Sequence, residues 1–146
     1  MATSDCEIVT KRIISAPRAR IWRAWTEPEH LSQWWGPKGF TNTFHEFDLR
    51  PEGVWRFVMH GPDGTDYKNK SFFREITPPE RLVFDHVSGH LFQAIATFEE
   101  KGPAETLVTY RMVHPTAEQC ERVKGFVGSA NEELFDRLEA ELARMP

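Results

Sequence analysis

The sequence predicts an α+β fold in which a curved seven-stranded antiparallel sheet wraps around one long C-terminal helix. Apolar residues recur at helical spacing after residue 115, and they alternate with polar residues between positions 40 and 114. One helix is too narrow to cover a flat sheet of seven strands, so burying its apolar stripe requires the sheet to curl. At 146 residues the chain fits one domain, residues 1–146.

Two short helices are expected between the first and second strands. Residues 7–14 have the composition of a strand, and Pro17 then favours a helix start because its missing N–H is not needed in the first turn. Apolar residues at helical spacing support a helix over residues 17–25. A second short helix is expected from residue 28 to Trp34 or Trp35.

Six strands are predicted between Phe40 and His114. Five short turns rich in glycine and proline divide this region, and connections this short favour antiparallel hairpins. In residues 54–60 large apolar side chains alternate with Arg56 and His60, which indicates one buried face and one wet face. The inward positions of the next two strands are predicted to be Tyr67, Asn69, Ser71, Phe73, Leu82, Phe84 and His86.

A long amphipathic helix is predicted from Thr116 to near the end of the chain. Thr116 is a suitable N-cap and is followed by an acidic first turn. Gly125 and Gly128 each cost about 1 kcal/mol relative to alanine in a helix, so they indicate a close approach, a bend, an adjoining empty space or a tolerated defect. The predicted apolar stripe consists of Val123, Phe126, Val127, Ala130, Leu134, Leu138 and Leu142.

Composition argues against several classes of function. The net charge of -4 at pH 7 does not suit a nucleic-acid-binding surface, which is normally basic. Cys6 and Cys120 match no metal or redox spacing, and no apolar run is long enough to cross a membrane. Residues 1–7 are polar and acidic, unlike a signal peptide. We expect a cytoplasmic protein without nucleic-acid partners or membrane insertion, and the sequence leaves open whether it forms a homodimer.

Two adjacent tryptophans, Trp34 and Trp35, precede a Gly-Pro-x-Gly turn and then Phe40. Glycine and proline fix the backbone of such a turn, so the rings beside it are held in defined positions. A corner of this kind is suited to closing over a cavity. The alternative is that both rings are ordinary core residues, because tryptophan packs into cores as readily as into binding sites.

Several strings, in chain order, resemble a known family. They are Ala16-Pro17 with Trp22, residues 34–40, residues 53–64, residues 74–82 and Asp136-Arg137-Leu138. Together they resemble the START-like (SRPBCC) superfamily with its helix-grip fold, and more narrowly the activator of Hsp90 ATPase homologue family. The resemblance implies a deep cavity between sheet and long helix that in related families holds lipids, polyketides or other apolar molecules. Members often carry a Gly-Trp pair in the last helix, where this chain has Ala130-Asn131, so the lining there is expected to be smaller and more polar.

The leading hypothesis is a protein that binds a small hydrophobic or amphipathic ligand in this cavity, without a cofactor. Small-molecule sites are mostly apolar with a few polar groups, and the aromatic content of the chain fits that description. The alternative is a fully packed core. The predicted ligand-binding residues are Trp35, Trp55, Phe57, Met59, Tyr67, Asn69, Phe73, Phe84, His86, Phe126 and Asn131.

A second hypothesis is an enzyme of the cyclase or hydrolase type that uses the same pocket. Glu75 and His86 are weak candidates for a general acid or base, with Asn69 or Tyr67 orienting the substrate. A hydrogen-bonded strand end for Glu75 and an ordinary buried histidine for His86 are the favoured alternatives. No catalytic residue is therefore assigned, and a binding protein is favoured over an enzyme.

Two further roles are not favoured. His86 and His90 flank a short turn, but zinc needs three or four ligands and Asp85 is expected on the opposite face, so no metal site is predicted. Stimulation of an Hsp90-type ATPase is a third hypothesis, which only the family resemblance suggests.

Overall fold

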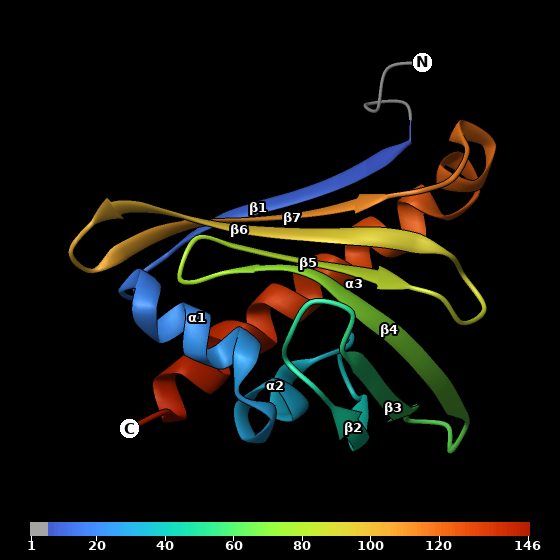
Figure 1. Ribbon diagram of the computed structural model, residues 1–146, viewed down its shortest axis with the longest axis horizontal. Coiled ribbons are helices and arrows are strands. Elements are labelled where there is room, and N and C mark those ends of the chain that lie inside the picture. Colours follow the sequence, from blue (N-terminus) through green and yellow to red (C-terminus); the bar gives the residue numbers. More distant parts are fainter. Residues whose placement is uncertain (1–5) are drawn as a thin grey trace.

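The computed structural model describes residues 6–146 and confirms the predicted fold. A seven-stranded sheet curves over one long helix, and two short helices follow the first strand (Figure 1). The elements are β1 (Glu7–Ile14), α1 (Arg18–Thr26), α2 (Pro28–Trp34), β2 (Thr41–Phe47), β3 (Val54–His60), β4 (Asp66–Thr77), β5 (Arg81–His86), β6 (Phe92–Gly102), β7 (Glu105–Val113) and α3 (Ala117–Arg144).

All neighbouring strands are antiparallel, in the order β1-β7-β6-β5-β4-β3-β2. Strands β2 to β7 are successive hairpins, as their short turns predict, and β1 completes the sheet by pairing with β7, with Glu7 opposite Val113. In Figure 1, α3 runs diagonally beneath the sheet, and α1 and α2 lie on the same side. The concave side of the sheet therefore carries all of the described helices.

The core fills the space between the concave face and the helices. Trp34 is fully buried, and its Nε1 donates a hydrogen bond to the Ala24 carbonyl oxygen at 2.9 Å. Its ring meets that of Trp25 edge to face, with centroids 4.9 Å apart. On β6, the buried Ala94 and Ala96 leave space for large rings from the helices. Trp34 is therefore a core residue, as the alternative interpretation of the tryptophan pair held.

A bulge in β4 corrects one prediction. Phe73 lies opposite Phe84, but the register shifts before Glu75, which lies opposite Val83. The extra residue reverses the alternation of side chains beyond Phe73. Glu75 therefore points to the outer face of the sheet, where its carboxylate pairs with Arg81 at 3.1 Å. The expectation that Glu75 faces the cavity is wrong.

The buried face of α3 also differs from the predicted stripe. The helix begins as expected at Thr116, whose hydroxyl accepts a hydrogen bond from the Gln119 N–H at 3.1 Å. However, Phe126 is 77% exposed. Successive helical residues are turned by about 100°, so Phe126 points away when its neighbour Val127 packs against the core. The buried residues of α3 are Cys120, Asn131, Leu134, Phe135, Leu138, Glu141 and Leu142.

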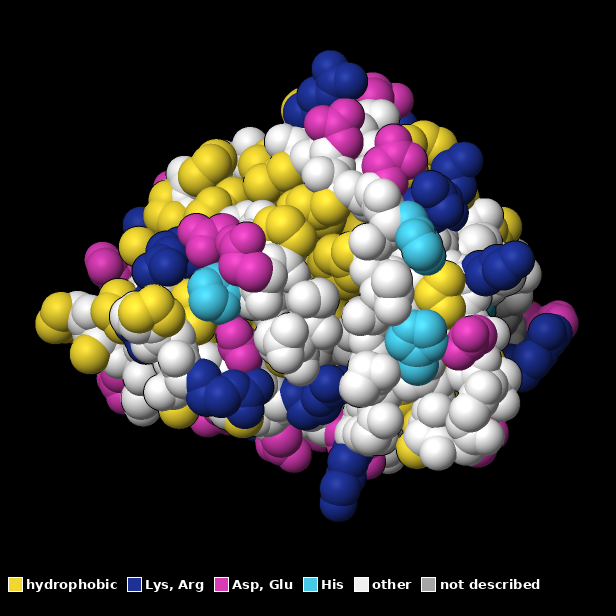
Figure 2. All heavy atoms as spheres, turned by 90° about the horizontal axis from the view of Figure 1, so that it is seen from below, with side chains coloured by type: hydrophobic (Ala, Val, Ile, Leu, Met, Phe, Trp, Pro, Cys, Tyr) yellow, Lys and Arg dark blue, Asp and Glu magenta, His cyan; other side chains and the backbone are white. Residues whose placement is uncertain are grey.

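The surface carries mixed charge. On the face shown in Figure 2, acidic and basic side chains are interspersed, and hydrophobic side chains gather in a hollow near the centre. Within residues 6–146, no helix combines the length and apolar character needed to cross a membrane.

Candidate functional site

A cavity of about 170 Å³ lies under the inner face of β3, β4 and β5. We call it the inner cavity. Its wall forms because alternate side chains of these strands point inward, and because Trp35 approaches from the turn that follows α2. The lining residues are Trp35, Trp55, Phe57, Met59, Asn69, Ser71, Phe84, His86 and Phe92.

The turn of residues 34–40, here called the Trp35 turn, is held in place by Arg137 of α3. The guanidinium Nη1 donates to the carbonyl oxygens of Gly36 at 2.8 Å, Pro37 at 3.0 Å and Trp35 at 3.3 Å. Nη2 donates to the carbonyl oxygens of Gln33 at 3.0 Å and Phe40 at 2.8 Å. A single arginine thus binds five carbonyl oxygens at the end of α2 and in the turn. Two of them have a second donor, since the Trp35 oxygen also accepts from Asn42 Nδ2 and the Pro37 oxygen from the Phe40 N–H.

Gly36 is required at the centre of this turn. Its φ of 103° belongs to the left-handed region that favours glycine. A Cβ at this position would lie 2.6 Å from Met59 Cε, so a side chain would displace part of the cavity wall. The absence of a side chain therefore lets the Trp35 turn close tightly over the cavity.

Aromatic rings form most of the inner wall. Trp55 stacks on Phe57 with centroids 4.6 Å apart and meets both Trp35 and Phe84 edge to face at 5.3 Å. Interlocked rings of this kind fix one another's orientation and are typical of rigid small-molecule sites. Trp35 is itself a buried core residue and also forms part of the cavity wall, whereas Trp34 does not line the cavity.

The polar part of the wall is built around His86. Its Nδ1 lies 2.6 Å from the carbonyl oxygen of His90, and its Nε2 lies 2.7 Å from Asn69 Oδ1. The ring also stacks on Phe92 at 4.8 Å. Burial lowers the pKa of His86, against the opposing effect of its bond to His90, so the ring is neutral at pH 7. A neutral imidazole carries one N–H, so His86 donates to only one of these two oxygens at a time. His86 is thus a polar element of the wall.

Two residues of the wall also carry a buried polar atom that has no partner among the described residues. Trp55 Nε1 and Ser71 Oγ are both buried and form no hydrogen bond there. The two residues lie directly opposite each other on β3 and β4. Buried donors are normally paired, since leaving one unpaired costs about 1–3 kcal/mol.

A second hollow of about 130 Å³ adjoins the inner cavity and shares Trp35 and Phe92 with it. Its far side is formed by α3, where Asn131 Nδ2 lies 3.4 Å from Met112 Sδ. Asn131 thus contributes a small polar wall on the helix side, at the position where the sequence predicts one. The other residues of this hollow are Gly36, Pro37, Tyr110, Met112, Ala130 and Leu134.

Some predicted site residues lie elsewhere. Phe73 is buried in the core and does not line the inner cavity. Tyr67 and Phe126 line a separate, outer hollow of about 550 Å³ near the Trp35 turn. Conversely, Ser71 and Phe92 line the inner cavity but are missing from the predicted set. The alternation of side chains along β4 already places Ser71 on the inner face. In β6, apolar residues occur on both faces, so the sequence does not indicate which of its side chains point inward.

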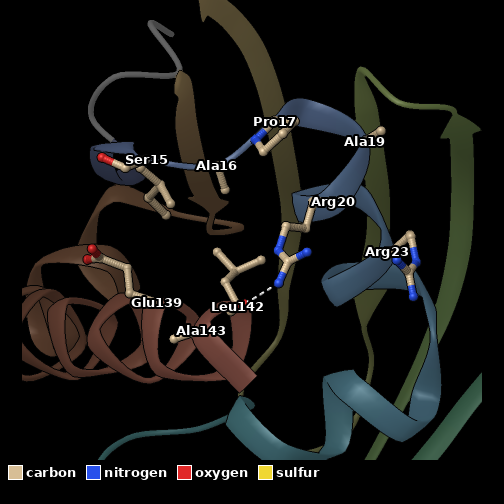
Figure 3. Close-up of a pocket in the computed structure, with 10 residues that line it drawn as sticks. Ser15, Ala16, Pro17, Ala19, Arg20, Arg23, Glu139, Leu142 and Ala143 are labelled. Atoms are coloured by element: carbon tan, nitrogen blue, oxygen red, sulfur yellow. Dashed lines mark hydrogen bonds between the residues drawn. The ribbon is translucent and has the colours of Figure 1, made fainter. Parts of the chain in front are cut away.

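A further surface hollow, about 620 Å³, lies outside the sheet, where the loop after β1 and α1 meet the end of α3 (Figure 3). Its arginines are already engaged. Arg20 Nη2 donates to the Leu142 carbonyl oxygen at 2.8 Å, and Arg23 pairs with Glu27 at 3.2 Å. Arg20 thereby caps the carboxyl end of α3. We interpret this hollow as a by-product of helix docking.

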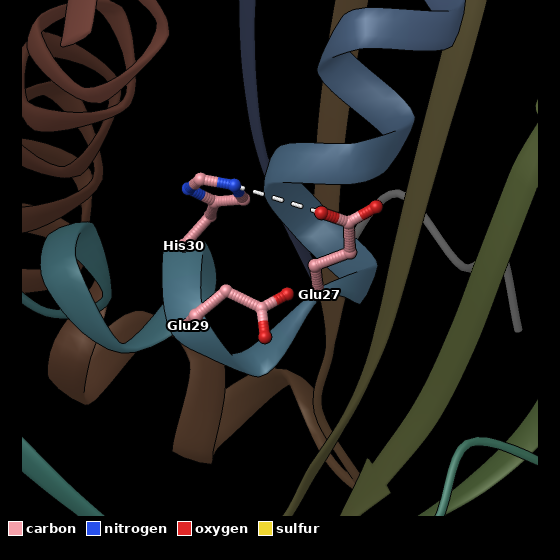
Figure 4. Close-up of side chains that lie close together, drawn as sticks. All are labelled: Glu27, Glu29 and His30. Atoms are coloured by element: carbon pink, nitrogen blue, oxygen red, sulfur yellow. Dashed lines mark ion pairs between the residues drawn. The ribbon is translucent and has the colours of Figure 1, made fainter. Parts of the chain in front are cut away.

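One group of three potential metal ligands occurs among residues 6–146, formed by Glu27, Glu29 and His30 of α2 and its N-cap (Figure 4). His30 Nδ1 lies 2.9 Å from the buried Glu141 carboxylate, and its Nε2 lies 3.6 Å from Glu27. Both ring nitrogens therefore face carboxylates of the protein itself. The contact between His30 and Glu141 joins α2 to α3.

A histidine pair lies at the end of β6 and β7. His114 Nδ1 lies 3.2 Å from the Cys6 carbonyl oxygen, and its Nε2 lies 3.0 Å from His90 Nε2. Since a carbonyl only accepts, Nδ1 carries the proton and Nε2 accepts from His90. Burial and the neighbouring His114 and His86 lower the pKa of His90.

Comparison with known proteins places this geometry in a family. Residues 15–143 match the family described as Activator of Hsp90 ATPase homolog 1-like protein. A solved protein from Nitrosomonas europaea shares 25% identity and a TM-score of 0.87, covering 97% of this chain and 96% of that chain. One from Arthrobacter aurescens shares 22% identity and a TM-score of 0.88, covering 99% and 90%. The AHSA1 protein from Silicibacter pomeroyi shares 20% identity and a TM-score of 0.76, covering 94% and 98%. No curated protein matches the chain.

Proposed function

We propose that this chain, which belongs to the Activator of Hsp90 ATPase homolog 1-like family, binds a small hydrophobic or amphipathic ligand in the inner cavity. The observation that carries the proposal is an unfilled volume of about 170 Å³ lined mainly by interlocked aromatic rings, including Trp35. The second hollow lies on the α3 side and shares Trp35 and Phe92 with the inner cavity. We propose that binding occurs in the cytoplasm, as the sequence predicts.

An enzymatic role in the same pocket receives less support. Glu75 lies on the outer face and pairs with Arg81. His86 would have to give up its contact with Asn69 before it could exchange a proton with a substrate. The polar groups of the wall therefore suit recognition better than proton transfer.

Interaction with an Hsp90-type chaperone is a second candidate. It is suggested by the family description and by the exposed ring of Phe126 beside Tyr67 in the outer hollow. An Hsp90 ATPase assay with wild type and Phe126→Ala tests it. A stimulated rate that falls in the variant would support this candidate, and an unchanged rate on titration of wild type would remove it.

Calorimetric titration of apolar ring compounds tests the ligand-binding proposal. A Ser71→Leu variant fills part of the inner cavity, and Ser129→Leu on the exposed face of α3 is the matched control. We expect binding by wild type and by Ser129→Leu, and its loss in Ser71→Leu. If Ser71→Leu binds the compounds as tightly as wild type does, the ligand site lies elsewhere. If wild type binds none of the compounds tested, the proposal is refuted.

A further inference from the structure

His90 and His114 form a pair of imidazoles at one end of the sheet. His90 precedes β6 and His114 follows β7, and the pairing of Gln93 with Val113 brings these two ends together. The two Nε2 atoms lie 3.0 Å apart, and the ring centroids are 4.8 Å apart. Neither histidine lines the inner cavity, so the pair is separate from the proposed ligand site.

His114 is held in the form that binds metal ions. Its backbone N–H and its Nδ1 both contact the carbonyl oxygen of Cys6, at 2.8 Å and 3.2 Å. A carbonyl oxygen only accepts, so Nδ1 keeps its proton and the lone pair of the neutral ring lies on Nε2. Metal-binding histidines usually donate their other ring N–H to a carbonyl or carboxylate in this way, which fixes the tautomer and the ring orientation.

His90 supplies the second nitrogen and the access from solvent. The residue is exposed, whereas His114 is buried. Partial burial of the ring and the neighbouring His114 and His86 lower the pKa of His90, so the ring is neutral at pH 7, as a metal ligand must be. A metal ion takes the place of the proton that His90 Nε2 donates to His114. That proton moves to Nδ1 of the same ring, which gives the other neutral tautomer.

The separation of the two nitrogens fits one shared metal ion. With metal–nitrogen distances of about 2.0–2.1 Å, a nitrogen separation of 3.0 Å gives an N–metal–N angle of about 90–100°. Neighbouring ligands in square-planar and octahedral complexes subtend about 90°, and the square-planar arrangement of nitrogen ligands is typical of Cu²⁺ and Ni²⁺. Tetrahedral Zn²⁺ needs a separation of about 3.3–3.4 Å, which a small movement of the exposed His90 provides.

Water completes the coordination of such an ion. Among residues 6–146, the group of three ligands described above lies on α2 and its N-cap, so no third cysteine, histidine or carboxylate ligand adjoins His90 and His114. A site with two protein ligands keeps open positions, unlike the closed four-ligand sites of structural zinc. Two imidazoles also favour transition metals over Mg²⁺ and Ca²⁺, which prefer oxygen ligands.

We propose that His90 and His114 bind a divalent transition-metal ion through their Nε2 atoms, with water in the remaining positions. This site goes beyond the proposed ligand-binding function and does not depend on it. Spacing along the sequence suggests His86 as the partner of His90. However, His86 Nδ1 contacts the His90 carbonyl oxygen at 2.6 Å, and its Nε2 contacts Asn69. The nitrogen that faces His90 Nε2 belongs to His114.

Calorimetric titration of the untagged chain with Ni²⁺ and with Zn²⁺ tests the site. His90→Gln removes the exposed ligand, and His114→Gln removes the buried one. Two control variants remove histidines elsewhere: His30→Gln disrupts the group of three on α2, and His60→Gln alters β3. Circular dichroism verifies that each variant is folded, and His90→Gln, at the exposed position, decides if His114→Gln is not.

Wild type, His30→Gln and His60→Gln are expected to bind Ni²⁺ with the same affinity. The affinity should fall at least about 10-fold in His90→Gln and His114→Gln, because even the loss of a group that supports a metal ligand typically costs about 10- to 100-fold. Zn²⁺ should also shift the imidazole NMR signals of His90 and His114, and Mg²⁺ should not.

Two results would overturn the assignment. If His90→Gln binds Ni²⁺ as tightly as wild type, or if His30→Gln abolishes binding instead, the metal ion lies elsewhere. If wild type binds neither Ni²⁺ nor Zn²⁺, the metal site does not exist. Neither result bears on ligand binding in the inner cavity, which the titration with ring compounds tests separately.

Discussion

Replacing Arg137 of α3 by methionine removes the anchor of the Trp35 turn while keeping a long side chain at this position. The guanidinium reaches five carbonyl oxygens at 2.8 to 3.3 Å through two nitrogens. In the variant the carbonyls of Gln33, Gly36 and Phe40 lose this partner and must turn to water or remain unpaired. Those of Trp35 and Pro37 keep their bonds to Asn42 Nδ2 and the Phe40 N–H. We therefore expect the turn to loosen and the stability of the protein to fall.

The size of the loss follows from the number of strong bonds. A hydrogen bond to a charged group contributes about 1.5–3 kcal/mol net. Arg137 is only part-buried, and three carbonyls share Nη1, so we count one full bond for each of the two nitrogens at the low end of that range. The expected loss is about 3 kcal/mol. With an unfolding entropy of about 2.1 cal/mol/K per residue, this corresponds to a decrease in Tm of about 10 °C.

Thermal and urea unfolding, followed by circular dichroism, measure this effect. Arg122→Met is the matched control, because Arg122 lies on the same helix but forms only an exposed pair with Glu118 at 2.9 Å. The control should lose no more than about 0.5 kcal/mol. A loss for Arg137→Met as small as that of the control would refute the anchoring role and show that water replaces the guanidinium without cost.

The other predictions concern the outer face, α3 and the histidine pair. Glu75→Gln should leave ligand affinity unchanged in calorimetry, because this side chain lies outside the cavity. A large loss of affinity would show that Glu75 contributes to the ligand site. Gly128→Ala should raise stability by about 1 kcal/mol, because the added methyl meets open space in a helix; an unfolding curve shifted to lower temperature would contradict this. Burial and the neighbouring His114 and His86 lower the pKa of His90 in the folded protein. As the pH falls below about 6.5, residue 90 therefore becomes protonated in the unfolded chain before it does so in the folded protein, and the stability of wild type decreases. His90→Gln should lose less stability between about pH 7 and pH 5, and parallel melting profiles would contradict this.

Much of the fold could be predicted because periodicity reports directly on which face is buried. The alternation in β3 placed Trp55, Phe57 and Met59 on the inner face, where the cavity lies. The same rule failed at Glu75. A bulge inserts one residue into the pairing, and the sequence around it carries no composition signal for that insertion.

Other features depend on contacts between distant parts of the chain. The sequence singled out the Trp35 turn, but its anchor, Arg137, lies about a hundred residues away and binds backbone atoms, which leave no mark in the identity of the contacted residues. Phe126 was misplaced because its neighbour Val127 is also apolar, so either could have belonged to the buried stripe. That Ser71 Oγ lacks a hydrogen-bond partner can be recognised only when the positions of the surrounding polar groups are known.

A two-dimensional NMR titration with acetophenone tests the central claim most directly. The indole N–H signals of Trp35 and Trp55 report on the inner cavity, while the amide of the exposed Phe126 reports on the outer hollow. Ligand binding in the inner cavity predicts saturable shifts of both indole signals, with the Phe126 amide unchanged. Shifts confined to the surroundings of Phe126, or no shifts up to the solubility limit, would contradict the account.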